Sequence, residues 1–447
     1  MLLFGVTVSP EGVRTVREHV FVARGTERSS GVVRVGRSYA TRMSQAQAAT
    51  LNDQADAARS LWNLIHAYHE FHANQQRWPS WSEVDEAIRQ ARHEIPWLGV
   101  LPAQAAQQVL RTYRRAWENY WARTHGRPTW RSKRARRAVD VPQARDLNLT
   151  QLNRRWWSAQ IPKVGRVKVR VQQRLPDRIT GARIVRQANG WQLIVRGEDH
   201  AARLAACDPK RILGLDRGVT HTLADSEGRF LDMPDTITPA EVRRLHRLEC
   251  KSARQRSHRP KRSRPSNREL RTYQQIAKLR ARQARRRHDW THQTTASLCR
   301  GNIGALAIEA LNVKKMTASA HGTINQSGRR VAQKARLNRA ILNQGWGQIE
   351  RLLTYKAERS GRTVVKVKPQ HTSQTCHRCG NVAAHQRESQ ALFCCQACGW
   401  NGSADTNAAI NISTRAGRKV SALDVEAIAA GRPVKRQNPN RALARAA

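Results

Sequence analysis

The sequence predicts a multidomain α+β protein that combines a β-barrel interrupted by a helical insert, a domain built on a short mixed sheet, and a small zinc-binding module. Three observations predict this organisation. Alternating apolar and basic residues flank an Ala- and Leu-rich helical stretch in the first half of the chain. Two short apolar runs in the second half each end in a carboxylate, and two Cys-x-x-Cys pairs lie near the C-terminus. A chain of 447 residues has room for roughly two to four such domains.

The first predicted domain is a barrel. Residues 13–24 and 31–40 mix β-branched with basic side chains, as strands that face a polyanion would. Apolar and basic residues alternate again over 161–171, and further strands follow at hairpin spacing around Asn189-Gly190. We therefore expect the barrel to be formed by two segments, residues 1–43 and 125–205.

A helical insert is expected over residues 44–124, between the two barrel segments. Over 44–76 the apolar residues fall near one face of a helix. The string from Ser80 to Glu83 has the capping-box pattern that opens a second helix, and Pro102 opens a third. The change of period from two to 3.6 residues marks the boundary between barrel and insert.

The second predicted domain is built on a sheet and occupies residues 206–370 and 400–425. Its first strand ends at Asp216, and the turn at 225–228 predicts a three-strand meander, which is how an RNase H-like sheet begins. A basic helical hairpin over 241–300 comes before the strand that ends at Glu309.

A single long helix is expected from Asn338 to Ser360, with Gly361 as its stop. Six apolar side chains are expected to face inward from it: Ile341, Leu342, Trp346, Ile349, Leu352 and Leu353. A buried strand over 363–367 follows the helix.

Three carboxylates stand at the ends of predicted elements. Asp216 and Glu309 end apolar runs, and Asp405 opens a helix seven residues after the last cysteine. Carboxylates are hard oxygen ligands for Mg²⁺, and two divalent ions about 4 Å apart can hydrolyse a phosphodiester. The acids can meet only if the two strands are neighbours and the helix packs over them. Any one acid could equally be a cap or a surface carboxylate, but the ordered set indicates a nuclease with two catalytic Mg²⁺.

Two cysteine pairs predict a structural zinc site. Tetrahedral Zn²⁺ takes four thiolates from two tight knuckles, and fifteen residues between the pairs make a normal ribbon loop. Cys394 could compete with Cys395, but only Cys395 keeps the spacing to its partner. The expected ligands of one Zn²⁺, within a module over 371–399, are Cys376, Cys379, Cys395 and Cys398. A redox pair is the alternative to zinc.

The charge balance points to nucleic acid. The chain has 80 Lys and Arg residues against 33 Asp and Glu, a net charge of +47. That exceeds the roughly 6–10 phosphates that a specific DNA-binding protein neutralises, so we expect a folded RNA as well as DNA. A ribosomal or chromatin-like basic protein is the plain alternative, but it has no need of three acids at element ends. Residues 426–447 are expected to form a basic, flexible tail.

Interleaved basic and aromatic residues suggest where nucleic acid binds. Arginine and lysine can neutralise phosphates while Trp130 stacks on a base, although a solvated basic loop would look the same. The predicted contact residues are Arg127, Trp130, Arg131, Lys133, Arg134, Lys163, Arg166 and Lys168. No run approaches the ~18 apolar residues of a membrane span, and the first residues do not form a signal peptide. We therefore expect no membrane partner and a cytoplasmic, nucleoid-associated protein.

Several motifs resemble those of a known family. They are GLDRGV at 214–219, IEALNVKKM at 308–316, TSQTCHRCG at 372–380, CQACG at 395–399 and DTNAA at 405–409. These strings resemble the TnpB family of transposon-encoded RNA-guided nucleases and the closely related miniature type V CRISPR effectors. The resemblance covers nearly the whole chain and is most specific over 211–412.

The resemblance implies an RNA-guided DNA endonuclease with a wedge barrel, a helical recognition insert, a RuvC-like nuclease domain and a zinc-bearing target nucleic-acid-binding domain. In this family Asp216, Glu309 and Asp405 match the metal-binding catalytic triad. A guide RNA would pair with one strand of double-stranded target DNA, while the protein reads a short flanking motif. A monomer is favoured. The gene context, transposon or CRISPR array, stays open with a slight preference for the transposon.

The chain departs from the family pattern at two places, and three alternative functions compete with the one that the resemblance implies. Ser403-Ala404 replaces a usual Asp-Arg pair, and Ala310 replaces an acid that commonly follows the middle Glu. One alternative is a guided DNA-binding protein with weak or no cleavage, and another is a guide-free RuvC-like nuclease. A cut-and-paste transposase normally orders its acids Asp, Asp, Glu, whereas the order here is Asp, Glu, Asp. We therefore predict cleavage without strand transfer.

Overall fold

The structure is a computed structural model that describes residues 32–133, 135–200, 207–260, 263–322, 328–387, 389 and 391–421. The chain divides into two compact units. Within the described residues, the N-terminal unit comprises 32–200 and 237–283, and the C-terminal unit comprises 207–236 and 284–421. The strand expected over 13–24 and the tail expected over 426–447 lie outside the described residues.

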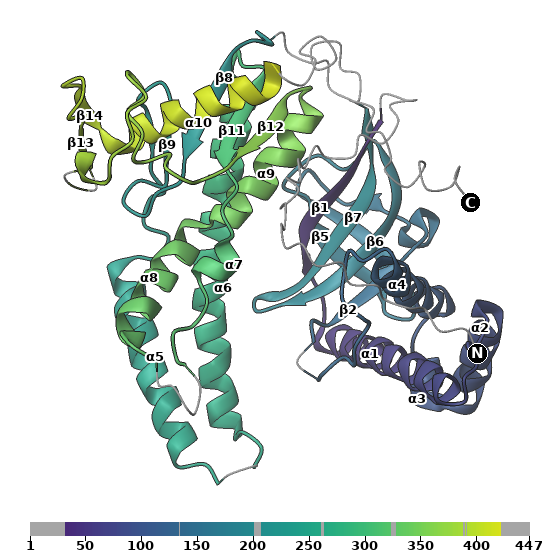
Figure 1. The fold of residues 1–447 in the computed structure, drawn as a ribbon. Coiled ribbons are helices and arrows are strands. Elements are labelled where there is room, and N and C mark those ends of the chain that lie inside the picture. The colour runs from purple at the N-terminus through teal and green to yellow at the C-terminus, as the bar shows by residue number, and fades with distance from the viewer. Residues whose placement is uncertain are drawn as a thin grey trace. The chain divides into compact units, whose positions relative to one another are not determined.

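A seven-stranded antiparallel sheet forms the centre of the N-terminal unit (Figure 1). Its strands are β1 (Val32–Arg42), β2 (Ala138–Val141), β3 (Thr150–Gln151), β4 (Trp156–Ile161), β5 (Gly165–Arg170), β6 (Arg178–Gln187) and β7 (Gly190–His200). They are hydrogen-bonded in the order β2-β6-β7-β1-β5-β4-β3, and a short 3₁₀ helix, η1 (Ala144–Leu147), lies between β2 and β3. In the part of the chain that the structure describes, the edge strands β2 and β3 do not pair with each other. Closure into a barrel therefore stays a prediction.

The alternating stretch over 161–171 is not the single strand that its pattern indicates. Strand β4 ends at Ile161, and β5 begins at Gly165 and pairs back onto it. In the turn between them, Lys163 has a φ of +62° and Gly165 a φ of +91°. Pro162 cannot donate to a ladder, and it favours a turn. Apolar and basic residues continue to alternate through the turn, so the alternation by itself does not reveal that the stretch contains two strands.

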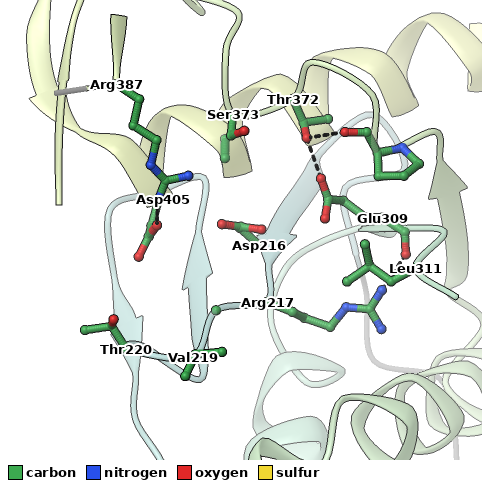
Figure 2. Close-up of a pocket in the computed structure, with 13 residues that line it drawn as sticks. Asp216, Arg217, Val219, Thr220, Glu309, Leu311, Thr372, Ser373, Arg387 and Asp405 are labelled. Atoms are coloured by element: carbon green, nitrogen blue, oxygen red, sulfur yellow. Dashed lines mark hydrogen bonds and ion pairs between the residues drawn. The ribbon is translucent and has the colours of Figure 1, made fainter. Parts of the chain in front are cut away.

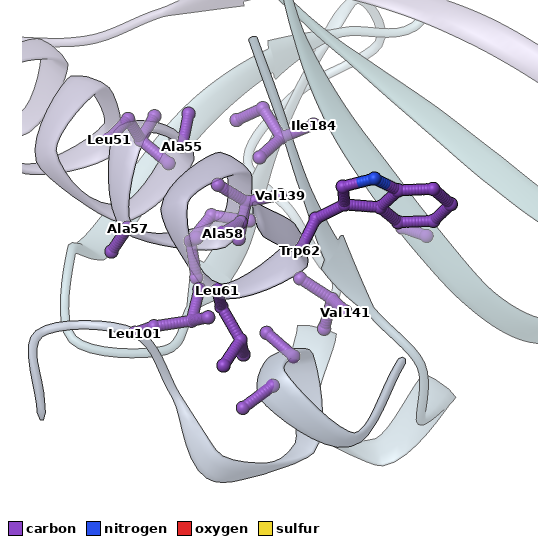
Figure 3. Packing of buried hydrophobic residues seen from close by; sticks show 14 of the residues in the cluster. Leu51, Ala55, Ala57, Ala58, Leu61, Trp62, Leu101, Val139, Val141 and Ile184 are labelled. Carbon is purple, nitrogen blue, oxygen red and sulfur yellow. The ribbon is translucent and has the colours of Figure 1, made fainter. Parts of the chain in front are cut away.

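Four helices form the predicted insert: α1 (Gln45–Asn74), α2 (Trp81–Glu94), α3 (Pro96–Gly99) and α4 (Ala103–Trp121). Both Ser44 and Ser80 close capping boxes, which confirms the predicted starts of the first two long helices. The side chains of α1 that face the sheet include Ala55, Ala58 and Leu61, and they belong to one buried cluster with residues of β2 and β6 (Figure 3). Small alanines let the helix lie close to the strands.

A helical hairpin is present over the region where the sequence predicts one, residues 241–300. It consists of α5 (Pro239–Ser257) and α6 (Asn267–Leu298). Two ion pairs join the helices, Arg280 to Glu249 at 2.7 Å and Arg282 to Glu241 at 2.7 Å. The hairpin was expected within the sheet domain, but residues 237–283 group with the N-terminal unit and the rest of α6 with the C-terminal unit. The proposed domain boundaries stay predictions.

The C-terminal unit contains a five-stranded mixed sheet. Its strands are β8 (Ile212–Asp216), β9 (Leu223–Asp225), β10 (Phe230–Leu231), β11 (Ala305–Glu309) and β12 (Thr363–Val367), in the order β10-β9-β8-β11-β12. The pairs β8-β9 and β9-β10 are antiparallel, which confirms the predicted meander. The pairs β8-β11 and β11-β12 are parallel, so their carboxyl ends lie at one edge.

Helices cover both faces of this sheet, and the side chains of β11 differ between the two faces. Leu306 and Ile308 pack in one cluster with α9 (Trp346–Arg359), whereas Ala305 and Ala307 pack with α10 (Ala404–Ser421). Figure 1 shows α10 crossing the strands. Because successive residues of a strand point to opposite faces, this alternation of large and small residues brings α10 close to the sheet.

Gly214, in the middle of β8, makes room for the same helix. A Cβ atom at this position would lie 2.0 Å from the carbonyl oxygen of Ala409 and 2.8 Å from the backbone nitrogen of Ser413. The Ser413 hydroxyl donates a 2.8 Å hydrogen bond to the carbonyl of Ile212, across the same contact. A side chain at position 214 would therefore push α10 off the sheet.

The single helix expected over 338–360 is two helices, α8 (Val331–Gln344) and α9, which is a correction to the sequence analysis. Gly345 ends α8 with a φ of +68°, a conformation that glycine adopts without strain. The indole N–H of Trp346 then donates to the carbonyl of Gly218 at 3.2 Å, which fixes the start of α9. Leu342, expected to face inward, is 54% exposed. An apolar period alone does not reveal a break at one glycine.

The remaining elements are short. They are α7 (Val313–Met316), η2 (Ala384–Gln386), β13 (Leu392–Cys394) and β14 (Asn401–Ser403). Strands β13 and β14 pair antiparallel and form a ribbon around the second cysteine pair, with β13 just before Cys395 and β14 between Cys398 and α10. Among the described residues, no helix combines the length and the apolar character needed to cross a membrane.

The contact at Gly214 can be tested by substitution. Gly214→Ala should lower the free energy of unfolding by about 3 kcal/mol or more, because backbone atoms cannot yield to the added methyl group. Differential scanning calorimetry of the purified protein measures this change. Gly347→Ala is the matched control, since a Cβ atom at Gly347, in α9, meets nothing within 4 Å. Equal unfolding temperatures for the two variants would contradict the analysis.

Candidate metal centres

The three predicted acids converge on one pocket. Asp216 ends β8 and Glu309 ends β11, and both side chains point to the face of the sheet that α10 covers. Leu215 and Ile308 are paired in the parallel ladder, so the next residues, Asp216 and Glu309, lie side by side at the carboxyl edge of the sheet. Asp405 lies in the first turn of α10, which crosses this edge. All three carboxylates line a pocket of about 290 Å³ (Figure 2). The arrangement required by the sequence analysis is therefore present.

The pocket concentrates negative charge. Burial and, after it, the nearby carboxylates of Glu309 and Asp405 together raise the pKa of Asp216 to about 7. Glu309 is 9% exposed and the side chain of Asp405 is 15% exposed. Three hard oxygen donors in a partly dry pocket repel one another unless cations join them. The chemistry of this donor set fits divalent ions such as Mg²⁺.

An arginine from the zinc-binding module enters the same pocket. The guanidinium of Arg387 lies 3.3 Å from Oδ1 of Asp405, and its charge opposes the rise in the pKa of Asp216 (Figure 2). The sequence analysis missed this residue because one arginine does not stand out among 80 basic residues. Its place midway between the two cysteine pairs is the signal that could have found it.

Buried charges hold the strand ends that carry the acids. The side chain of Arg217 is fully buried, donates to the backbone carbonyl of Glu309, and pairs with Glu350 at 3.0 Å. Lys366 also pairs with Glu350. Burial by itself would raise the pKa of Glu350, but the hydrogen bonds and charges of Lys366 and Arg217 hold it below its usual value. This network links β8, β11 and β12 beneath the pocket.

The two departures from the family pattern lie beside the pocket without entering it. Ala404 is fully buried and packs with Cys376, Phe393 and Cys395 in the core of the ribbon. Ala310 is exposed and does not line the pocket, and its backbone N–H donates to Val367 at 2.8 Å. Ser403, where the family pattern has an acid, does not line the pocket either. The positions of both missing acids therefore lie outside the set of lining residues.

The cysteine pairs form a second candidate metal centre. The sulfur atoms of Cys376, Cys379, Cys395 and Cys398 all lie within 4.8 Å of one another. Sulfur atoms from different pairs approach closely, at 3.7 Å between Cys376 and Cys398 and 3.5 Å between Cys379 and Cys395. Four thiol groups from two knuckles fit tetrahedral Zn²⁺. Cys394 is not part of the cluster, which agrees with the choice of Cys395 by spacing.

The predicted nucleic-acid contacts differ in how they are engaged within the N-terminal unit. Trp130 is 53% exposed, with one edge against the ring of His66. Arg127 is exposed and lies over the ring of Trp117. Arg131 instead lies 3.6 Å from the ring centre of Trp62, and burial lowers its pKa to about 10. Of these residues, Trp130 and Arg127 are placed to meet a ligand, whereas Arg131 serves the protein interior.

The other predicted contacts lie on the surface of the same unit. Lys133 and Lys168 are exposed. Lys163 and Arg166 are also exposed, but Lys163 donates to the carbonyl of Gly99 at 2.7 Å and Arg166 to the hydroxyl of Thr150 at 3.1 Å. Arg134 lies outside the described residues. All of these nucleic-acid contacts stay predictions.

Comparison with known proteins gives sequence relatives over most of the chain. InsQ of Escherichia coli (strain K12), named as an RNA-guided DNA endonuclease, is 31% identical over 344 residues, which cover 77% of this chain and 81% of InsQ. A Streptomyces pristinaespiralis protein with the same kind of name is 25% identical over 385 residues, which cover 83% of this chain and 87% of the relative. The family described as Cas12f1-like, TNB domain, matches residues 346–412.

A solved structure shares the fold. The cryo-EM structure of the Cas12f1-sgRNA-target DNA complex contains a chain that matches with a TM-score of 0.51 and 15% sequence identity, and 82% of each chain is covered. At this identity the likeness concerns the fold alone. The mixed α/β fold described above is thus the fold of a Cas12f effector.

The crowded acids should cost stability when no cation is bound. The raised pKa of Asp216 means that the folded state holds its proton more tightly than the unfolded state does, so stability falls as the pH rises from about 4 towards 7. In magnesium-free buffer at pH 8, Asp216→Asn should therefore raise the unfolding temperature by several °C, since 1 kcal/mol corresponds to about 2–4 °C. The difference should disappear near pH 4. Thermal scans at both pH values measure it.

Asp235 provides the control, because it is exposed and does not line the pocket. Asp235→Asn should leave the unfolding temperature within about 1 °C of the wild type at both pH values, as surface substitutions usually do. A gain of the same size in both variants would show that net charge, and not crowding in the pocket, is responsible.

Zinc content distinguishes neighbouring cysteines. Cys395→Ser should lose the bound zinc and unfold the ribbon, because the site then lacks one of its four sulfur ligands. Cys394→Ser should keep one zinc per chain, since Cys394 is outside the cluster. Inductively coupled plasma mass spectrometry of the two purified variants gives the answer. Loss of zinc from the Cys394 variant would contradict the assigned ligand set.

Proposed function

The chain belongs to the TnpB-type family of RNA-guided DNA endonucleases, and on this premise we propose that it binds a structured guide RNA and cleaves guide-complementary double-stranded DNA. The convergence of Asp216, Glu309 and Asp405 in one pocket carries the proposal. Homologues over most of the chain are named as RNA-guided DNA endonucleases. The acids would supply the metal ligands for cleavage, and the excess of basic residues would neutralise the phosphates of the nucleic acids.

The guide RNA and the target DNA together account for the charge. A net charge of +47 calls for many more phosphates than one short DNA duplex presents. In the proposed division of labour, base pairing with the guide reads the target, while the protein reads a short flanking motif and the shape of the RNA–DNA heteroduplex. We assign motif reading to the barrel-like sheet and the helical insert of the N-terminal unit. Trp130 and Arg127 are proposed contacts because both are exposed and pack against aromatic rings of that insert, Trp130 against His66 and Arg127 over Trp117.

The five-stranded sheet supports a RuvC-like assignment. A three-strand meander followed by two parallel strands, with acids at the ends of the first and fourth strands and on the last helix, is the order expected for such a domain. We therefore propose that this sheet is the nuclease core, and that the ribbon with its four cysteines is the target nucleic-acid-binding module. One Zn²⁺ would be held there in a structural role.

The acids of this core would hold the catalytic ions. Asp216, Glu309 and Asp405 provide the carboxylate oxygens for two Mg²⁺. When bound, the ions supply a deprotonated water and stabilise the leaving oxygen of the phosphodiester. The chain itself sets the position of the oxygens: Asp216 and Glu309 are fixed by parallel neighbouring strands, and Asp405 by the first turn of α10.

Arg387 is the residue best placed to meet the scissile phosphate. Its guanidinium is 3.3 Å from Asp405 and lines the pocket. Once cations neutralise Asp405, this guanidinium can turn to a phosphate oxygen, where a charge-assisted bond stabilises developing negative charge. Because Arg387 belongs to the zinc-binding module, that module would complete the catalytic site.

The test is to express the protein with its native flanking DNA, sequence the RNA that stays bound, and assay cleavage of matching DNA with Mg²⁺. A single scaffolded RNA with a variable end is expected. Asp216→Ala should reduce cleavage by about 10³-fold or more, because losing a metal ligand costs several kcal/mol and each 1.4 kcal/mol is tenfold. Guided DNA binding should be retained.

Asp235→Ala serves as the control, since this carboxylate lies outside the pocket, and it should cleave at the wild-type rate. Full cleavage by the Asp216 variant would refute the assigned site. Heterogeneous RNA that is released by moderate salt would refute guided function, because it indicates nonspecific binding to polyanions.

A further inference from the structure

Thr372 places a buried hydroxyl against one of the catalytic acids. It lies between β12 and the first cysteine pair, and it is 2% exposed. Its Oγ1 is 2.5 Å from Oε1 of Glu309 and 2.9 Å from the carbonyl oxygen of Pro369. Dashed lines mark both contacts in Figure 2. A hydroxyl has one proton to donate, and an ionised carboxylate is a stronger acceptor than a carbonyl. The proton of Thr372 therefore goes to Glu309.

This bond restrains Glu309 at the end of its side chain. The last torsion of a glutamate is broad and nearly free in the absence of a partner. With Oε1 held by Thr372, the plane of the carboxylate is fixed, while Arg217 holds the backbone carbonyl of the same residue. Glu309 is thus oriented at both ends before any cation arrives.

Side chains along one face of α10 hold the segment that carries Thr372. Asn411 donates from Nδ2 to the carbonyl of Thr372 at 2.9 Å and to the carbonyl of Thr375 at 2.6 Å. Asn407 donates to the same Thr375 carbonyl at 2.8 Å, and its Oδ1 accepts the backbone N–H of His377 at 2.9 Å. These asparagines are four positions apart, so they lie above each other on one face of the helix.

The asparagines connect the two metal centres. Asn407 is fully buried and Asn411 is 6% exposed, so their hydrogen bonds are shielded from water. His377 lies between Cys376 and Cys379, and α10 begins with Ala404 and Asp405. The same helix therefore presents one catalytic acid and fixes the loop that orients another.

We propose that Thr372 is a positioning residue that orients Glu309 for divalent-cation binding, held in place by Asn407 and Asn411. The proposal rests on the proposed function in one respect, namely that the acids bind the cation. The hydroxyl raises the affinity of the pocket for the cation because Glu309 loses less freedom on binding it. Groups that orient a metal ligand typically change metal affinity or activity by about 10–100-fold when they are removed.

The experiment measures Mn²⁺ binding to the full-length protein by electron paramagnetic resonance, without nucleic acid, for Thr372→Val and Thr372→Ser. Valine matches the shape of threonine but lacks the hydroxyl, and serine keeps it. Thr372→Val should bind Mn²⁺ about tenfold more weakly, and Thr372→Ser should stay within about threefold of the wild type. Asp216→Ala gives the background from sites outside the pocket.

Thr375→Val is the matched control in the same segment. Its hydroxyl donates to the carbonyl of His371 and does not contact Glu309. This variant should bind Mn²⁺ like the wild type, and all three threonine variants should keep one zinc per chain. In the guided cleavage assay, Thr372→Val should raise the Mg²⁺ concentration for half-maximal rate by the same factor of about ten, with a similar rate at saturating Mg²⁺.

Equal Mn²⁺ affinity in Thr372→Val and the wild type would overturn the proposal. So would an equal loss in the serine variant, because packing and not the hydroxyl would then be responsible. A third outcome separates this inference from the proposed function. The wild type could bind Mn²⁺ in the pocket, and Thr372→Val could weaken that binding as expected, while no guided cleavage is observed. In that case the proposed function fails and this inference stands. A wild type that binds no Mn²⁺ above the Asp216→Ala background would overturn both.

Discussion

The candidate active site depends on how closely α10 packs onto the five-stranded sheet. The helix reaches β8 because Gly214 has no side chain, and it reaches β11 because Ala305 and Ala307 face it. Asp405 lies in the first turn of this helix, so the packing distance determines how near it comes to the two acids on the strands. A larger residue on this face would separate the carboxylates. The geometry of the candidate site is therefore set by packing, through small residues that themselves bind nothing.

The same convergence creates an electrostatic conflict that the protein resolves locally. Burial and two neighbouring carboxylates raise the pKa of Asp216 to about 7, so the pocket is poorly suited to hold three negative charges alone. Arg387 partly balances them from above, and the ion pair between buried Arg217 and half-buried Glu350 keeps the strand ends in place from below. Removing Glu350 would leave the fully buried guanidinium of Arg217 without its ion-pair partner, which is destabilising. Binding of cations in the pocket would relieve the repulsion among the three carboxylates.

The module that carries the four cysteines also contributes to the candidate active site. It contributes Arg387 to the pocket, and its first knuckle is hydrogen-bonded to Asn407 of the helix that begins at the catalytic edge. Ala404, directly before Asp405, fills the core of the ribbon beside Cys376 and Cys395. The cysteine cluster and the acidic pocket thus share one helix, so the order of one supports the order of the other.

The sequence by itself determined most of the helices and strands and the residues that could bind metal ions. Capping boxes at Ser44 and Ser80, the meander after Asp216 and the spacing of the cysteines follow from local preferences, which a linear pattern records. The break at Gly345 and the turn at Lys163 escaped it, because one left-handed residue interrupts an element without disturbing its hydrophobic period. Arg387, Thr372 and the pairing of Arg217 with Glu350 were decided only by the tertiary structure. Their roles depend on contacts between residues 18 to 133 positions apart, and no local preference specifies which distant partner a side chain will meet.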